Sequence, residues 1–426
     1  MSFRIIKPRR MRKTNYELKN NPPYVLPYSS PLPFLLTGAI LKPSPYSTPS
    51  HVIANLSGTK IVPDISGYFG WSVDTDKIAK YAVIGAPIYN SMVGFAKIYS
   101  IQNNVATLLY TTSQEQTANN MIGFSVAISG NGNTIAVGVP GYNSNRGAVL
   151  LYSNNNGSIT YTGRIDPSGV SVGDYAGQFV KLNYDGTILA IGAPLASTNA
   201  GKVWMYKYTN AWNLQQTITA PAGVSYFGDA ITMNSDGTRM FITSKLTSSG
   251  GITCRAYNYN YSTTWSVNGF VSLAITTAFA ISSVDFDAKM SDDAKYLFIS
   301  SPNQNDTSGI VKISTLNSSL QEDYSTTLTP DTGETGFGYR IASSGDGRTL
   351  YVSSVTNDSN EGEIWIYRQS EQFPKSWIRV LSPFRGTNDI GSSQQGFSIA
   401  CSFDGSNLVI GGPYDDNNKG ASWSFI

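Results

Sequence analysis

Phe69-Gly70-Trp71-Ser72-Val73, followed closely by Val83-Ile84-Gly85-Ala86-Pro87, is the clearest structural signal in this chain. It predicts a short strand opened by a glycine, a tight polar turn, and a hydrophobic strand that ends in Gly before Pro. A polar loop closed by glycine and a third strand rich in aromatic residues complete the pattern, as in residues 147–152 and 201–206. The unit is therefore an antiparallel meander.

The unit recurs seven times along the chain. Its opening glycine, or the equivalent residue, stands at positions 70, 123, 177, 228, 285, 338 and 396. Positions 70 and 396 are six repeats apart, so the mean period is about 54 residues. The fifth copy, Asp285-Phe286-Asp287-Ala288, is degenerate. Seven repeats of this length predict an all-β, seven-bladed β-propeller with four-stranded antiparallel blades.

The composition agrees with this fold. Only 14% of the 426 residues are charged, whereas 41% are hydrophobic and 12% aromatic, with 40 Gly and 20 Pro. Amphipathic helices need Lys and Glu on their wet faces, so an all-α bundle or a coiled coil is excluded. The two cysteines, Cys254 and Cys401, are too few for a disulfide framework. We expect neither a signal peptide nor a membrane anchor, because the longest apolar run, residues 32–41, is interrupted and short.

The two ends of the repeat array predict how the ring closes. Each repeat continues into a fourth strand, but the seventh stops at Ile426, directly after its third strand. The missing strand is expected in residues 51–57, which would complete the last blade and remove an exposed edge. Residues 51–426 are thus predicted to form the propeller, preceded by an arm of residues 1–50.

The repeated Phe-Gly-x-Ser-Val and Val-Ile-Gly-Ala-Pro phrases resemble the FG-GAP repeat of integrin α-subunit propellers over residues 51–426. The resemblance implies the propeller fold. Many proteins of that family bind calcium through an Asp-rich loop between the first two strands. Here those loops carry one or two carboxylates, as in Asp185-Gly186 and Asp346-Gly347, too few for calcium's six or more oxygen ligands. We interpret them as hairpin turns, and we expect no metal and no cofactor.

Catalytic residues are not recognisable in the sequence. The single histidine, His51, falls in the expected closing strand. A Ser-His-Asp arrangement would need it to point into a pocket, so we interpret it as an ordinary strand-end residue. His and Cys are too few for a zinc site, and no phosphate-binding glycine loop of the Walker type is present. We therefore expect a protein that is not an enzyme.

Residues 1–50 differ from the body in charge. They hold eight bases and one acid, a balance of +7, which leaves 22 bases and 27 acids, or −5, for the body. A basic arm followed by a stretch rich in Pro and aromatic residues favours docking along a partner protein. Its alternating bases could instead bind the phosphates of a nucleic acid. The third alternative is a loose linker. The residues expected to bind the partner are Arg4, Lys7, Arg9, Arg10, Arg12, Lys13, Tyr24, Tyr28 and Phe34.

The loops between second and third strands are polar and aromatic, and seven such loops would gather on one face of the disc. Side chains there that could contact a glycan or a protein are Tyr89, Tyr142, Arg146, Tyr414, Asp415 and Asp416. The alternative is that Asn, Ser and Gly in these loops only make good turns.

Two functions remain open from the sequence. The first is a structural protein of a large assembly, fastened by residues 1–50 to other structural proteins. A virion capsid, tail or fibre accessory protein, assembled in the host cytoplasm, combines an FG-GAP-like ring with the expected lack of a secretion signal. The alternative is a module that recognises a host receptor or glycan through the loop face. We expect neither a membrane nor nucleic acid as the main partner.

Overall fold

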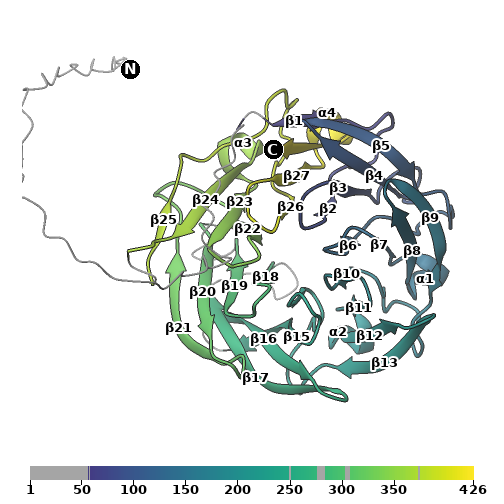
Figure 1. The fold of residues 1–426 in the computed structure, drawn as a ribbon, viewed down its shortest axis with the longest axis horizontal. Helices are drawn as coiled ribbons and strands as arrows, with labels where there is room; N and C mark the ends of the chain where they lie inside the picture. The colour runs from purple at the N-terminus through teal and green to yellow at the C-terminus, as the bar shows by residue number, and fades with distance from the viewer. Residues whose placement is uncertain (1–55, 57, 249–250, 276–283, 303–307, 373–374) are drawn as a thin grey trace, which may run out of the picture. The chain divides into compact units, whose positions relative to one another are not determined.

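The computed structural model describes residues 56, 58–248, 251–275, 284–302, 308–372 and 375–426. The chain divides into two units, residues 1–48 and 49–426, and the described residues all belong to the second. This unit consists of seven four-stranded antiparallel sheets set radially around a central channel (Figure 1). The predicted seven-bladed propeller is confirmed.

Each blade is a meander whose first strand lines the channel and whose fourth strand lies at the rim. Blades 1–3 are β2 (Ser72–Thr75), β3 (Tyr81–Ala86), β4 (Phe95–Gln102) and β5 (Val105–Thr111); β6 (Val126–Ile128), β7 (Thr134–Val139), β8 (Ala148–Asn155) and β9 (Ser158–Ile165); and β10 (Phe179–Leu182), β11 (Ile188–Ala193), β12 (Lys202–Tyr208) and β13 (Trp212–Thr219). Blades 4–6 are β14 (Ile231–Met233), β15 (Arg239–Ser248), β16 (Gly251–Tyr261) and β17 (Trp265–Ile275); β18 (Asp287–Met290), β19 (Tyr296–Ser301), β20 (Ile310–Leu316) and β21 (Glu322–Leu328); and β22 (Phe337–Ser343), β23 (Thr349–Ser354), β24 (Glu363–Gln369) and β25 (Trp377–Arg379).

Blade 7 combines the two ends of unit 2. Its sheet has the order β1 (Thr59–Ile61), β28 (Ala421–Phe425), β27 (Leu408–Gly412) and β26 (Ser398–Cys401). An N-terminal strand therefore closes the ring, at Thr59–Ile61, while the predicted residues 51–57 lie outside the described residues apart from Leu56. Thr59 pairs with Ser424 and Ile61 with Ser422, and of residues 51–57 only Leu56 is described, in a turn. The positive φ of Gly58, +63°, ends that turn, so the strand begins after it.

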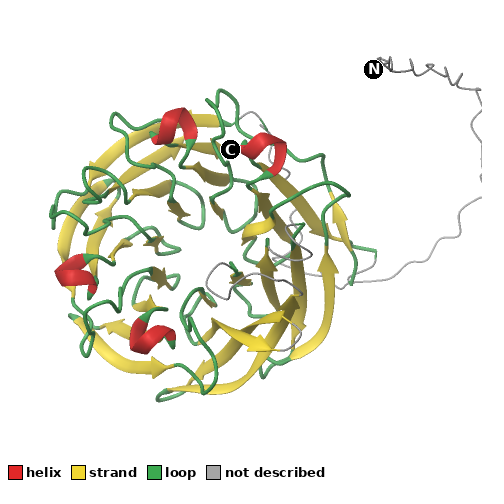
Figure 2. Cartoon of the chain, turned by 180° about the vertical axis from the view of Figure 1, so that it is seen from behind, coloured by secondary structure: helices red, strands yellow, loops and turns green. Residues whose placement is uncertain are grey.

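The alternation of strands gives the disc two unlike faces. Connections from first to second and from third to fourth strands lie on one face, which we call the turn face. Connections from second to third strands, and from one blade to the next, lie on the other, which we call the loop face. Four of the loop-face connections contain a single helical turn (Figure 2), namely α1 (Tyr142–Asn145), α2 (Ala196–Asn199), α3 (Asn357–Asn360) and α4 (Asp415–Asn418).

These helical turns join neighbouring blades. Their central residues have left-handed backbones, for example Asn143 with φ +50° and Ser144 with φ +58°. This conformation, which Asn and Ser tolerate better than branched residues, directs main-chain carbonyls at the next blade. Tyr175 and Ala176 donate their N–H groups to the carbonyls of Asn145 and Arg146. The same pair of bonds links blade 7 to blade 1, where Tyr68 and Phe69 donate to Asn418 and Lys419.

The glycine of the Ile-Gly-Ala-Pro phrase has a packing role. A Cβ added to Gly85 would lie 2.0 Å from the carbonyl oxygen of Gly123 in the next blade, and one added to Gly411 would lie 1.9 Å from that of Gly70. The two glycines of the repeat meet in this way across four blade interfaces, since Gly138 and Gly192 lie similarly close to the carbonyls of Gly177 and Gly228. No other residue permits this approach, which is why both glycines recur together.

A second ring of contacts runs around the turn face. One main-chain N–H at the end of each first strand donates to a carbonyl of the next blade, at distances of 2.7–3.3 Å. The seventh bond, from Phe403 N–H to the Lys77 carbonyl, returns to blade 1. The complete set is Lys77 to Gly130, Asn131 to Tyr184, Tyr184 to Ser235, Ser235 to Asp292, Asp292 to Gly345, Gly345 to Phe403 and Phe403 to Lys77.

The hydrophobic core lies between the blades. One cluster joins Ile84 and Tyr99 of blade 1 to Val409 of blade 7. Another joins Phe298 of blade 5 to Trp365 and Val352 of blade 6. Because each sheet buries its face on its neighbour, stability depends on an unbroken ring.

Candidate binding face

The central channel has a volume of about 620 Å³ and is lined by the first strands of all seven blades. Its floor lies at the turn face. There Lys77 of blade 1 reaches Asp292 of blade 5 with an Nζ–Oδ1 distance of 2.7 Å. The Lys77 ammonium also lies 5.7 Å from the ring centre of Phe403. This ion pair crosses the channel at the turn face, and we call the opposite end, on the loop face, the mouth.

Aromatic side chains line one half of the mouth. The residue after the repeat glycine is Trp71, Phe124, Tyr339 or Phe397 in four blades. Each ring contacts the next. The centroids are 5.8 Å apart for Phe124 and Trp71, 4.8 Å for Trp71 and Phe397, and 5.2 Å for Phe397 and Tyr339. Tyr414 extends this aromatic arc, 5.9 Å from Phe397. Such an arc offers apolar contact area with little conformational entropy to lose.

The other half of the mouth is polar. Blades 3 and 4 carry Gln178 and Asp229 at the position of the aromatic residues, and Asp285 of blade 5 lies nearby on the channel wall. Asp229 is paired with Lys245 at 3.0 Å. Phe286, the equivalent residue of blade 5, is buried instead in the cluster that contains Val284.

Arg340 stands where the two halves meet. Its guanidinium lies 4.5 Å from the ring centre of Tyr339. Burial acts to lower the pKa of Arg340, but Tyr339 and the carboxylates of Asp285, Asp287 and Asp229 together raise it, so the side chain stays charged. Burial raises the pKa of Tyr339 to about 12, so this phenol is neutral. The mouth therefore combines a neutral aromatic half with a charged half.

The structure separates the predicted loop-face residues into several groups. Tyr414 lies in the aromatic arc. Tyr89 packs edge-on against Phe95 at 5.4 Å, and the Arg164 guanidinium lies 4.2 Å from the ring of Tyr142. Both tyrosines are half-buried against the core of their blades. Arg146 bonds the carbonyl of Asn143 in its own loop, and Asp416 has a left-handed backbone with φ +49°.

Asp415 holds the closing strand in place. Its side chain is 1% exposed, and its Oδ2 lies 2.7 Å from Lys60 Nζ in β1. Its Oδ1 accepts the N–H of Ile390 at 2.7 Å. Both carboxylate oxygens are thus occupied within the protein, and we do not retain Asp415 as a ligand contact.

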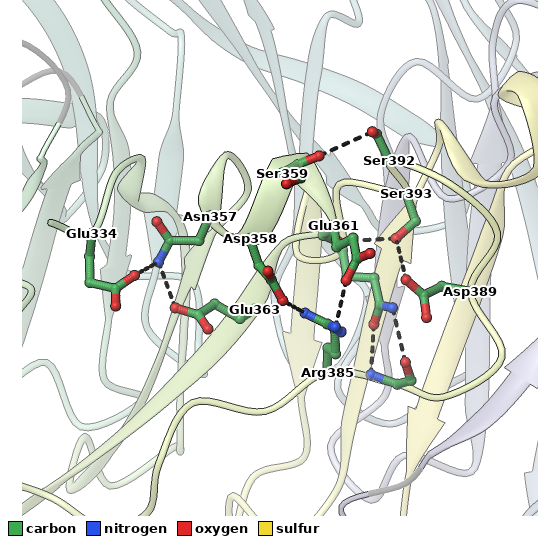
Figure 3. A network of polar contacts seen from close by, with 12 residues as sticks. Glu334, Asn357, Asp358, Ser359, Glu361, Glu363, Arg385, Asp389, Ser392 and Ser393 are labelled. Atoms are coloured by element: carbon green, nitrogen blue, oxygen red, sulfur yellow. Dashed lines mark hydrogen bonds and ion pairs between the residues drawn. The ribbon is translucent and has the colours of Figure 1, made fainter. Parts of the chain in front are cut away.

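The loop face of blades 6 and 7 is held by a polar network (Figure 3). Asn357 donates to Glu334 and, at 2.6 Å, to Glu363. Arg385 pairs with Asp358 and, at 2.5 Å, with Glu361. Burial raises the pKa of Glu363, although its hydrogen bond from Asn357 opposes this. These acids therefore serve to order the loops.

The polar turns between first and second strands have the interpreted hairpin form. Ser344 donates to Asp346 at 2.6 Å and accepts the N–H of Thr349, and Gly347 has φ +68°. Ser402 and Asp404 repeat this geometry. Within the described ranges, no group of three or more His, Cys, Asp or Glu side chains could hold a metal ion.

Several predicted residues cannot be placed. The arm residues Arg4, Lys7, Arg9, Arg10, Arg12, Lys13, Tyr24, Tyr28 and Phe34 lie outside the described residues, as does His51. The aromatic arc was missed apart from Tyr414. Its signal was present, since an aromatic residue follows the repeat glycine in most copies. In the part of the chain that is described, no helix is long and apolar enough to cross a membrane.

Comparison with known proteins gives the class of the protein. No family model matches the chain. Integrin alpha-2 of Bos taurus is 26% identical over 44% of this chain and 20% of that protein, so this chain matches about a fifth of its length. A solved protein from Lactobacillus plantarum has a TM-score of 0.50 at 14% identity, covering 75% of this chain and 84% of that one. A chain of the mitotic checkpoint complex has a TM-score of 0.53 at 12% identity, covering 93% and 99%.

The two solved structures share the fold of this chain but little of its sequence, whereas integrin alpha-2 is similar to it in sequence. Together with the seven four-stranded blades and their paired glycines, they define an FG-GAP-like seven-bladed β-propeller. This is a fold typical of protein-interaction modules.

Proposed function

We propose that this chain is a non-enzymatic binding protein whose propeller recognises a partner through the loop face. The observation that carries the proposal is the aromatic arc at the mouth of the channel. Trp71, Phe124, Tyr339 and Tyr414 are each half-buried, so they keep some area for a ligand. Rigid aromatic side chains around a hollow are the usual anchors of binding surfaces.

The partner class follows from the two halves of the mouth. A protein loop or a terminal sugar of a glycan would combine apolar contact with polar groups facing Asp285 and Arg340. We propose a host receptor or glycan as this partner.

The charge of residues 1–50 favours a second role. We propose that this segment attaches the propeller to other structural proteins of a large assembly, such as a virion capsid, tail or fibre. A balance of +7 beside a body of −5 supports an acidic protein surface as its target.

Two variants separate these roles. Trp71→Ala combined with Tyr414→Ala removes part of the arc, whereas a protein of residues 46–426 lacks the arm. Loss of binding on a glycan array or to cell-surface protein in the first variant, with assembly retained, supports recognition. Unchanged binding to every surface by the first variant contradicts it. Unimpaired assembly of the second contradicts the anchoring role.

A further inference from the structure

A second pocket lies on the turn face between blades 3 and 4, remote from the channel mouth. It has a volume of about 270 Å³. Its walls come from the turns at Asp185 and Asp236, from the end of β12 and from the β16–β17 connection. All of these are connections of first to second or third to fourth strands, which places the pocket on the face opposite the aromatic arc.

Trp265 is the central wall of this pocket. It begins β17 and is 5% exposed, and its ring centre lies 5.3 Å from that of Tyr261. Gln216 of blade 3 fixes it from across the interface. The Gln216 Oε1 accepts the Trp265 N–H at 2.7 Å, and its Nε2 donates to the Trp265 carbonyl at 3.0 Å. The indole is therefore held rigidly in place by its own main chain.

The indole N–H of Trp265 has no acceptor within the described residues. Three other buried tryptophans each donate this group inside the protein, Trp204 to Ser168, Trp365 to Glu363 and Trp423 to Thr387. The indole nitrogen of Trp265 is nevertheless not fully enclosed by the protein. It therefore keeps some exposure, and Trp265 is one of the residues that line the pocket.

The remaining lining supplies both donors and acceptors. Lys207 provides an ammonium and Gln215 an amide. Gln215 is the extra residue of a β-bulge, since Met205 pairs with Gln216 and Tyr206 with Leu214, and a bulge redirects the side chain that it adds. Asp185 and Asp236 each use Oδ1 to hold their own turn, through Thr187 and Thr238. The Asp236 carboxylate is also bonded by the side chain of Asn234, whereas the Oδ2 of Asp185 has no such bond.

We propose that this pocket binds one ring of a saccharide. A pyranose ring presents C–H groups that pack on an aromatic face, here that of the half-buried Tyr261, and hydroxyl groups that both donate and accept hydrogen bonds. The indole N–H and the Lys207 ammonium would donate to the ring hydroxyls, and the free Oδ2 of Asp185 would accept from them. The volume lies at the lower end of ligand pockets, which fits one ring better than a larger ligand.

The matched control is in blade 3. Trp212 begins β13 as Trp265 begins β17, and it packs beside Tyr208 at 5.5 Å. Trp265→Phe removes the unpaired N–H and keeps an aromatic wall, and Trp212→Phe makes the same change outside the pocket. Lys207→Met and Gln215→Ala change lining groups that are not core residues, and they provide the test if Trp265→Phe does not fold.

The experiment titrates the full chain with methyl glycosides of glucose, galactose, mannose and N-acetylglucosamine, followed by tryptophan fluorescence and ligand-observed NMR. We expect at least one glycoside to bind with millimolar affinity, and Trp265→Phe to weaken it about tenfold, as the loss of one hydrogen bond implies. Trp212→Phe should bind as the wild type does. No binding at tens of millimolar, or binding that neither Trp265→Phe nor Lys207→Met weakens, overturns the proposal. The aromatic arc lies on the other face, so either result leaves the proposed loop-face function to its own test.

Discussion

Deleting residues 1–62 should open the ring, whereas deleting residues 1–58 should not. The shorter deletion leaves β1 in place and the longer one removes it. Three contributions are lost with β1: its main-chain ladder to β28, the burial of Ile61, which is 5% exposed, and the Lys60–Asp415 ion pair at 2.7 Å. Each main-chain hydrogen bond contributes about 1 kcal/mol, and burial of one isoleucine about 2 kcal/mol.

The ion pair is the largest of these contributions. Without Lys60, the carboxylate of Asp415, 1% exposed, keeps only the Ile390 N–H, and a buried charge stripped of its partner costs about 3 kcal/mol. The total is about 6 kcal/mol or more, which is comparable with the whole free energy of unfolding of an ordinary domain. The exposed edge of β28 would also invite pairing with other chains.

Thermal unfolding followed by circular dichroism, together with size-exclusion chromatography, measures both effects. The protein of residues 59–426 should be monomeric and melt near the full-length protein. The protein of residues 63–426 should melt at a much lower temperature or aggregate. A monomeric 63–426 protein with an unchanged melting temperature would refute the closure by β1.

Four further outcomes are expected. Gly138→Ala places a Cβ 2.1 Å from the Gly177 carbonyl oxygen and should cost about 2–3 kcal/mol in urea unfolding, whereas Gly163→Ala, with nothing within 4 Å, should cost about 1 kcal/mol. A calcium chelator should leave the melting temperature unchanged, and a fall of several degrees would contradict the hairpin interpretation of the Asp-Gly turns. The pKa of Glu363 is raised above 4.5, so its contribution to the free energy of unfolding is greatest below that pH and is lost as the pH rises through the raised pKa. Glu363→Gln should flatten this part of the pH profile of stability, measured by chemical unfolding. An unchanged profile would contradict the raised pKa. Residues 46–426 should fold yet fail to join the assembly, and release of the full chain should become easier as salt rises if the bases at 4–13 meet acidic surfaces.

The fold could be predicted because its signal is repeated. One Phe-Gly phrase carries little weight, but seven in register fix the strand pattern, the turn positions and the number of blades. The strand-closing model followed from the absence of a fourth strand after Ile426. The described closing strand is Thr59–Ile61, which follows the turn ended by Gly58 and is held by the Lys60 contact to Asp415, and the sequence pattern alone did not show this contact.

The candidate sites were harder to predict because each is assembled from several blades. Tyr414 was expected on the loop face, but its contact with Phe397, and the alignment of Phe397 with Trp71 and Phe124, exist only when the ring closes. Asp415 was expected to be a free loop acid, yet it is buried and pairs with Lys60, more than 300 positions away in the sequence. A loop sequence shows which groups are available, and not which of them other segments occupy.

The local structure of the chain could be predicted from its residues alone, since alternation and turn glycines act over a few residues and recur seven times at a regular period. The tertiary structure alone decided what lies at the centre and between the blades. The aromatic arc, the Lys77–Asp292 pair across the channel and the unpaired indole of Trp265 depend on contacts between residues from different blades. Those contacts form when the blades pack side by side in a closed ring, and the sequence shows which side chains are available there but not which of them meet.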